Sequence, residues 1–335
     1  MSNLSTFPRS GAVNNDTGTF TKDNALFLKV FSGEILTAFE ENNVMKGLHR
    51  VRTIGSGKSA QFPVTGIASA KYHEAGKDLM TEANGFLSDI AHAERTINID
   101  DVLIASTFLA NIDELKNHYD VRSIYAKELG KALAKRFDLA TMKTLISAAK
   151  DTSAIYTGAP TGETLTPNYG APTAPTAGEL IGSLMDCAQA LDEKDVSSDG
   201  RFALLEPADY YTLVSSDNVA INKDTSSGGD VTSGRISSVG GIRLIKTNHL
   251  KDVTVDNTSA ALAADDANAN NTYNADISAT RFVVATPEAI GTVKLLDLAT
   301  ESEYQIQRQG HLFVAKYAMG HGVLRPECAI AVDPT

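Results

Sequence analysis

The string closest to a catalytic motif is Gly55-Ser56-Gly57-Lys58-Ser59, which ends like a phosphate-binding loop. Such a loop needs another glycine five residues before Gly57 and a following helix whose N-terminal N–H groups meet the phosphates. Arg52 stands at that position, and residues 60–64 contain Pro63 and have the composition of a strand. The sequence therefore argues against a nucleotide site, and a nucleotide-dependent enzyme is kept only as an alternative.

No other string carries a complete chemical signature. His73-Glu74 begins like the zinc-protease motif HExxH, but Lys77 replaces the second histidine and Gly76 disfavours the helix that the motif needs. The seven histidines include no pair three or four residues apart, and the two cysteines form no CxxC pair, which suits a reducing compartment. We expect no catalytic residue, no cofactor and no metal, and we do not expect an enzyme.

An apolar stripe after Ala25 predicts the first element that could position interacting side chains. Its members recur every three or four residues, as in a helix, and are Leu26, Phe27, Val30, Phe31, Ile35 and Phe39. The helix either packs on its own domain or docks on a neighbouring subunit. The preceding residues are rich in Ser, Thr, Asn and Gly, which predicts an extended arm or a disordered tail.

A long two-stranded loop is predicted next. The glycine-rich turn at 55–66 leads into a strand at 61–64, and alternation predicts a second strand at 95–104, with Ile97, Ile99 and Val102 facing one way. About thirty residues with little apolar content separate the two strands, and loops of that length inside a domain are usually functional.

The strongest helical signal covers residues 113–150. Apolar residues recur at a spacing of four, at Val121, Tyr125, Leu129, Leu133 and Phe137. Lys127, Lys131 and Lys135 form a parallel polar stripe. Gly130 lies in the middle of this helix, where it costs about 1 kcal/mol relative to Ala and is a natural bending point.

A mixed α/β region is predicted after a linker that is rich in Gly, Pro and Thr and ends near 175. Helices are expected at 178–193 and 208–214, and strands at 202–205, 236–245, 282–285 and 328–332. The Asn- and Asp-rich segment 252–276 is predicted to be an exposed loop.

Composition excludes several classes of protein. The chain has 335 residues with 42% hydrophobic and 21% charged side chains, which is ordinary globular usage. The N-terminus lacks an apolar signal region and no apolar run approaches the roughly 20 residues of a membrane span. The net charge is −11, and residues 151–287 alone carry −10 from 18 acidic and 8 basic side chains. Tight binding to a nucleic-acid backbone needs the opposite sign.

Five strings closely resemble the major capsid protein of short-tailed, autographivirus-type bacteriophages and keep the order of that family. They are ALFLKVFSGEILTAF at 25–39, SGKSAQFPV at 56–64, NHYDVRSIYAKELGKALA at 117–134, AIGTVKLLDLA at 289–299 and AKYAMGHGVLRPE at 315–327.

The resemblance implies an α+β, Hong Kong 97-like capsid fold with an N-terminal arm, an extended E-loop, a peripheral domain and an axial domain. The corresponding segments are 1–54 for the arm, 55–104 for the E-loop and its strands, 105–160 and 288–335 for the peripheral domain with a spine helix at 113–150, and 161–287 for the axial domain.

The resemblance also implies a structural protein that self-assembles, as hexamers and pentamers, into an icosahedral shell around double-stranded phage DNA. Expected partners are further copies, a scaffolding protein, a portal at one vertex, a decoration protein and weakly contacted DNA, with no membrane. The protein would be made in the bacterial host cytoplasm and end in the virion. The alternative is an encapsulin-type compartment shell that encloses cargo protein.

Three sets of residues are expected to act in such a shell. Inter-subunit contacts are expected from Phe27, Phe31 and Phe39 on the arm and from Lys71, Tyr72, Lys77 and Asp78 in the E-loop. Gly130 would ease bending of the spine helix. The stripe of Lys127, Lys131 and Lys135 would face the DNA inside the shell.

Overall fold

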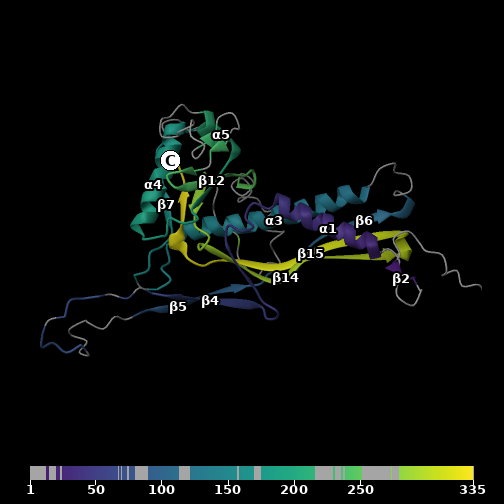
Figure 1. The fold of residues 1–335 in the computed structure, drawn as a ribbon, viewed down its shortest axis with the longest axis horizontal. Coiled ribbons are helices and arrows are strands. Elements are labelled where there is room, and N and C mark those ends of the chain that lie inside the picture. Colours follow the sequence, from purple (N-terminus) through teal and green to yellow (C-terminus); the bar gives the residue numbers. More distant parts are fainter. Residues whose placement is uncertain are drawn as a thin grey trace, which may run out of the picture.

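The protein is elongated, and a long helix lies roughly along its long axis in the middle of the molecule (Figure 1). The structure is a computed structural model. It describes residues 13–14, 20–22, 25–66, 68, 70–73, 75–79, 90–112, 121–156, 158–169, 175–215, 229–230, 235–236, 238–250, 273 and 279–334, with only the backbone of those up to 33. A six-stranded sheet lies at one end of the long helix, and a hairpin projects from the body near that end (Figure 1).

A four-stranded sheet supports the long helix, α3 (Val121–Lys150). Its order is β3 (Arg50–Thr53), β14 (Ile290–Gln305), β15 (Gly310–Val323) and β6 (Leu103–Ala110). Helix α1 (Ala25–Asn42) packs beside α3. Side chains alternate along the strands, so Phe313, Ala315 and Tyr317 are buried in the core that includes both helices.

A six-stranded mixed sheet forms the other layer of the body. Its order is β11 (Ser238–Val239), β12 (Ile242–Lys246), β8 (Phe202–Leu205), β13 (Phe282–Ala285), β16 (Ala329–Val332) and β7 (Glu163–Leu165). One face packs on the C-terminal half of α3, and the other on α4 (Ala177–Glu193) and α5 (Pro207–Ser215). Alternate residues of β8 serve the two faces, which is why this strand is apolar throughout.

The remaining elements are short or lie outside the body. The projecting hairpin consists of β4 (Ser59–Thr65) and β5 (His92–Asn98), which pair in antiparallel fashion. Two small antiparallel pairs are β1 (Val13–Asn14) with β2 (Phe20–Lys22) and β9 (Gly229–Asp230) with β10 (Arg235–Ile236). Single 3-10 turns occur at Ile306–Arg308 and Pro326–Cys328.

The structure confirms the mixed α+β class, the two-stranded loop and the helical part of 113–150 that it describes; 113–120 lie outside the described residues. Strands β8 and β13 have the predicted bounds. The strand predicted at 95–104 is confirmed over 95–98 and wrong beyond, because β5 ends at Asn98 and β6 begins at Leu103; Ile97 and Ile99 are buried as predicted, whereas Val102 is 47% exposed. The strand predicted at 236–245 is instead two strands joined through Gly240 and Gly241, both with positive φ.

Two expected segment boundaries also differ from the structure. Part of the expected arm belongs to the body, because α1 packs on α3 and β3 pairs with β14. The last strand, β16, joins the six-stranded sheet between β13 and β7 instead of the sheet of β14 and β15. Tyr273, within the segment predicted to be an exposed loop, is buried and donates a hydrogen bond to Asp100. The rest of 252–276 lies outside the described residues.

Gly130 lies in close contact with the backbone of α1. A Cβ atom at this position would be 2.8 Å from the Ala38 Cβ, 2.8 Å from the Ile35 carbonyl oxygen and 3.2 Å from the Phe39 nitrogen. Two of these atoms belong to the α1 backbone and cannot rotate away. Close helix packing therefore explains the glycine, and bending of α3 at this point stays a prediction.

We expect Gly130→Ala to lower the free energy of unfolding. Separating the two helices should cost about 1–3 kcal/mol, more than the roughly 1 kcal/mol gained from helix propensity. Gly182→Ala is the matched control, because Gly182 is in α4 and a Cβ there meets nothing within 4 Å. Denaturant unfolding of unassembled subunits should show opposite signs for the two variants. A stabilised Gly130→Ala protein would contradict this account.

Two buried histidines lie between α3 and the long strands. The His321 ring is hydrogen-bonded through Nδ1 to the Thr292 hydroxyl at 2.8 Å and meets the Phe137 ring edge-on at 5.1 Å. Burial, with the neighbouring His49, lowers the pKa of His321 to about 3. Burial also lowers the pKa of His49, against the opposing effect of its bond to the Met45 carbonyl.

The free energy of unfolding should therefore fall as pH drops from about 6.5 toward 3. An unfolded histidine binds a proton near pH 6.5, whereas folded His321 does so near pH 3, so the unfolded state holds more protons within this window. His321 contributes at most about 1.4 kcal/mol per pH unit. His321→Gln should reduce the slope of stability against pH, and His92→Gln, at an exposed position, should not. Equal slopes for all three proteins would refute the assignment.

Candidate assembly surfaces

The base of the projecting hairpin is anchored on β15 by close backbone contact. Ile97 and Ile99 belong to a small core with Ala60, Val293, Ala318 and Leu324. A Cβ on Gly320 would be 1.9 Å from the Asn98 carbonyl oxygen, and one on Gly322 would be 2.7 Å from the Ile97 side chain. These two glycines thus let the hairpin base lie directly against β15. Sequence reasoning missed this role, although two glycines spaced by two inside a strand signal close backbone approach.

Beyond this base the hairpin carries the four predicted contact residues on exposed chain. Lys71, Tyr72, Lys77 and Asp78 are all exposed between β4 and β5, and the Tyr72 side chain is fully accessible. They lie around one turn, in which His73 Nε2 is hydrogen-bonded to the Lys77 carbonyl at 2.8 Å. The histidine of the incomplete HExxH string therefore serves a local turn.

The predicted contact residues on the arm have a different placement. Phe39 is only 8% exposed, and its ring meets those of Phe137 and Tyr317 edge-on at 6.0 and 6.3 Å. This corrects the expectation of an inter-subunit contact, because Phe39 already packs in the core of its own chain. The side chains of Phe27 and Phe31 lie outside the described residues.

The lysine stripe lies on the exposed side of α3. Lys127, Lys131 and Lys135 are all exposed, and the Lys131 ammonium pairs with Glu128 one turn earlier at 2.9 Å. An exposed pair of this kind contributes little stability. The three lysines thus lie on one exposed side of α3, in agreement with the period of four.

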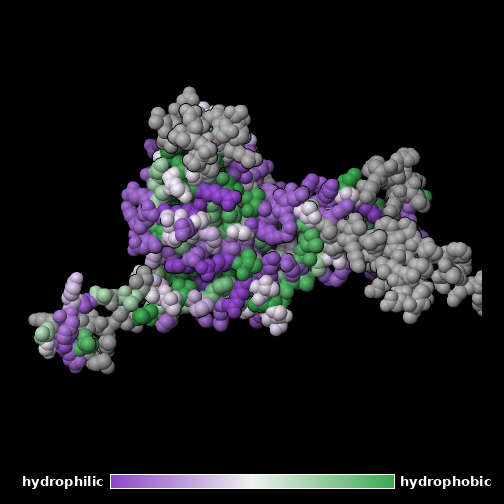
Figure 2. All heavy atoms as spheres, in the orientation of Figure 1, coloured by the Kyte–Doolittle hydropathy of each residue, from purple (hydrophilic) through white to green (hydrophobic). Residues whose placement is uncertain are grey.

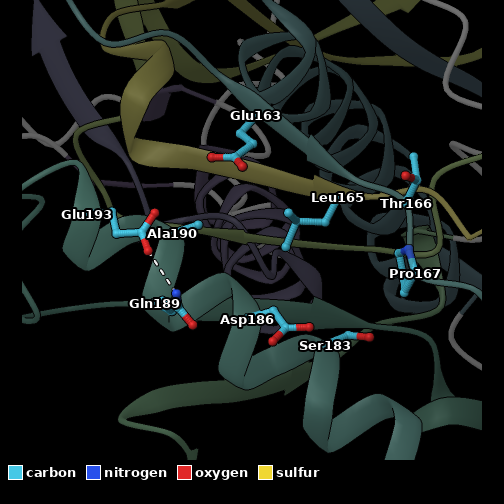
Figure 3. Close-up of a pocket in the computed structure, with 9 residues that line it drawn as sticks. All are labelled: Glu163, Leu165, Thr166, Pro167, Ser183, Asp186, Gln189, Ala190 and Glu193. Carbon is cyan, nitrogen blue, oxygen red and sulfur yellow. Dashed lines mark hydrogen bonds between the residues drawn. The ribbon is translucent and has the colours of Figure 1, made fainter.

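Three of the acidic side chains of residues 151–287 line a groove beside α4 (Figure 3). Asp186 and Glu193 on α4 line one side of this groove, and Glu163 and Leu165 on β7, followed by Pro167, line the other. Glu163 also pairs with Lys194 at 2.9 Å, which ties the edge strand β7 to the end of α4. The groove is thus lined by three carboxylates, of which Glu163 is paired with Lys194.

Apolar side chains on the surface are scattered in small groups among hydrophilic ones (Figure 2). On the outer face of the four-stranded sheet, Ile104 is 57% and Phe108 37% exposed on the edge strand β6. Within the described segments, no cluster of His, Cys, Asp and Glu could hold a metal ion. Among the helices described, none is long and apolar enough to cross a membrane.

Comparison with known proteins gives a consistent picture. The profile of the family described as "Gp10A-like: Major capsid protein" matches residues 61–333. The major capsid protein of Enterobacteria phage T3 is 35% identical over 92% of this chain and 91% of its own length. That of Escherichia phage T7 is also 35% identical, with the same coverage. The capsid structure of cyanophage P-SCSP1u is 36% identical, with a TM-score of 0.75 over 88% of each chain.

We expect Gly320→Ala to detach the hairpin base from β15. The new methyl group would overlap the Asn98 carbonyl, which is backbone and can move only with β5. Limited proteolysis should cut the hairpin of the variant at least about tenfold faster, because its base opens more often.

The matched control is Gly55→Ala, since a Cβ at Gly55 meets nothing within 4 Å. Equal proteolysis rates for Gly320→Ala and the unchanged chain would show that the hairpin does not depend on this contact.

Proposed function

The chain belongs to the family of Gp10A-like major capsid proteins and is a structural protein of a phage shell, and we propose how its copies hold one another. In this proposal the projecting hairpin of each copy, residues 59–98, is the E-loop of the fold and lies over a neighbouring copy. The relatives are phage capsid proteins, so the alternative of an encapsulin-type compartment shell has no support from them.

The observation that carries the proposal is the contrast between the two halves of the hairpin. Its base is fixed by a small core and by the close approach to Gly320. Lys71, Tyr72, Lys77 and Asp78, farther out, are all exposed in the single chain. The exposed outer part of the hairpin adds little stability to the isolated subunit. In this proposal it contributes to assembly when it covers apolar surface of another copy.

Many weak contacts of this kind suffice for a closed shell. Once two copies are held by one contact, a second contact forms at a raised effective concentration, so several modest interfaces act together. The hairpin suits this role because its rigid base fixes the direction in which its outer part projects (Figure 1). The assembly that we propose consists of hexamers and pentamers in an icosahedral arrangement.

We further propose that the basic side of α3 touches packaged double-stranded DNA weakly. Lys127, Lys131 and Lys135 offer a short row of cations on a chain whose net charge is −11. Few phosphate contacts on an acidic protein give weak, salt-sensitive binding, which leaves the DNA mobile. A scaffolding protein, a portal and a decoration protein remain proposed partners, as does synthesis in the bacterial host cytoplasm.

The test of the hairpin's role replaces residues 67–90 with an Asn-Gly turn. Gly66 already donates a backbone hydrogen bond to the Ala91 carbonyl at 2.7 Å, so a two-residue turn can close the ladder there. The subunit should keep its melting temperature, because the small core below is intact. Closed particles in negative-stain electron microscopy should be lost.

A matched control keeps the full-length hairpin and removes two positive charges of its outer turn, by Lys71→Gln and Lys77→Gln. Reduced but detectable particle formation is expected from it. Closed shells of normal size from the shortened protein would overturn the assignment of residues 59–98 as the element that holds neighbours.

A further inference from the structure

Strand β6 forms one edge of the four-stranded sheet, and its own residues do not protect that edge. Its sequence, LIASTFLA at 103–110, contains no charged residue, no proline and no glycine. It pairs with β15 on one side, and no other described strand pairs with it. Every second residue of an edge strand directs its N–H and C=O groups away from the sheet, where another strand can bind them. Proteins normally protect such an edge with charges, prolines or a short strand.

The other edges of the two large sheets and of the hairpin are protected in these ways. The opposite edge strand of the four-stranded sheet, β3, has four residues, which include Arg50 and Arg52. The six-stranded sheet ends in β11, with two residues, and in β7, with three, one of which is Glu163. In the hairpin, β4 contains Pro63 and β5 contains acidic and basic residues. Strand β6 is therefore the one long, uncharged edge among them.

The outer face of β6 is also largely apolar. Ile104 is 57% and Phe108 37% exposed, and Ser106 lies between them on the same face. On β15, Leu312 lies opposite Phe108 and Val314 opposite Ser106, both partly exposed, so the apolar surface continues across the sheet. The chain has a net charge of −11, and like charges placed opposite each other across strands are destabilising. A strand without charge is thus where two copies can approach without this cost.

We propose that β6 pairs with β6 of a second copy, antiparallel and about a two-fold axis, so that two four-stranded sheets become one. The strands of the hairpin fit this place less well, because β4 contains a proline and β5 carries charges. A two-fold contact uses the same surface of both copies, whereas a hairpin that lies over a neighbour makes a head-to-tail contact that closes rings. Pairing of β6 would then join one ring to the next. That consequence rests on the proposed function, but the pairing itself does not.

The register of the pair follows from the exposed side chains. Opposite residues of an antiparallel pair lie on the same face, so outer residues must meet outer residues if α3 of both copies is to lie on one side of the joined sheet. With Ser106 on the two-fold axis, the strands overlap over 103–109, and Ile104 of each copy lies opposite Phe108 of the other. A β-branched side chain opposite an aromatic one is a favourable cross-strand pair. Both exposed side chains are then covered.

The direct test is disulfide cross-linking of Ser106→Cys in assembled shells. Two-fold pairing places the Cβ atoms of the two new cysteines opposite each other, about 4.5–5.5 Å apart, which a disulfide can span after a small movement. The two native cysteines are buried and do not compete. Mild oxidation should convert most chains to covalent dimers on a non-reducing denaturing gel. The matched control, Ser302→Cys, should give few, because Ser302 is exposed on β14, two strands away from the edge.

Equal amounts of dimer from the two variants, or none from Ser106→Cys, would overturn the proposal. A cryo-electron microscopy map of the shell with a different segment of the chain along β6 would overturn it as well. Cross-linking reports on the pairing alone. Closed shells from the protein with the shortened hairpin would therefore refute the proposed role of the hairpin and leave the pairing of β6 to be judged by the covalent dimer.

A second test uses Ser106→Lys, which places two like charges opposite each other across the axis. The subunit should keep its melting temperature, because this side chain is exposed. The protein concentration needed for half-maximal shell formation should rise at least about tenfold, since like charges brought together at an interface repel. Ser106→Thr is the control, as threonine is uncharged and favoured in strands. Shell formation by the Lys and Thr variants at the same concentration would show that β6 does not pair in this way.

Discussion

The packing of α3 against both sheets is the contact on which the rest of the subunit depends. The C-terminal half of α3 is buried on nearly all sides, with Met142, Leu145 and Ile146 fully enclosed. It packs against β15 and β6 of the four-stranded sheet and against β16 and β13 of the six-stranded sheet, so one helix supplies the core of two layers. Because both sheets bury apolar side chains in one core with this helix, the loss of either sheet would expose part of α3, which couples the two layers into one unit.

A buried carboxylate reinforces that contact at the middle of the helix. Asp138 is fully buried and accepts hydrogen bonds from the backbone nitrogens of Val44 and Met45 and from His249 Nδ1, at 2.9 to 3.1 Å. It therefore joins the turn after α1 and the segment after β12 to α3. Since a buried charge without partners is expensive, these three segments are held in one arrangement. The directional hydrogen bonds of Asp138 fix how these segments are placed relative to one another, which apolar packing alone does not do.

The sequence was informative wherever the pattern is local. The spacing of four from Val121 to Phe137 and the apolar run of β8 identified their elements because each signal is contained within one segment. The sheet that β16 joins was not predictable, since a strand buried on both faces shows no alternation to assign a partner. Phe39 was misread, and the packing role of Gly130 was missed, for a similar reason, because what each contacts is another segment far away in the chain.

Charge decides which contacts between such subunits can be specific. With a net charge of −11, copies repel one another, but at physiological salt this repulsion fades over about 8 Å. Association must therefore come from contacts made at close range, where apolar burial and paired charges overcome the repulsion.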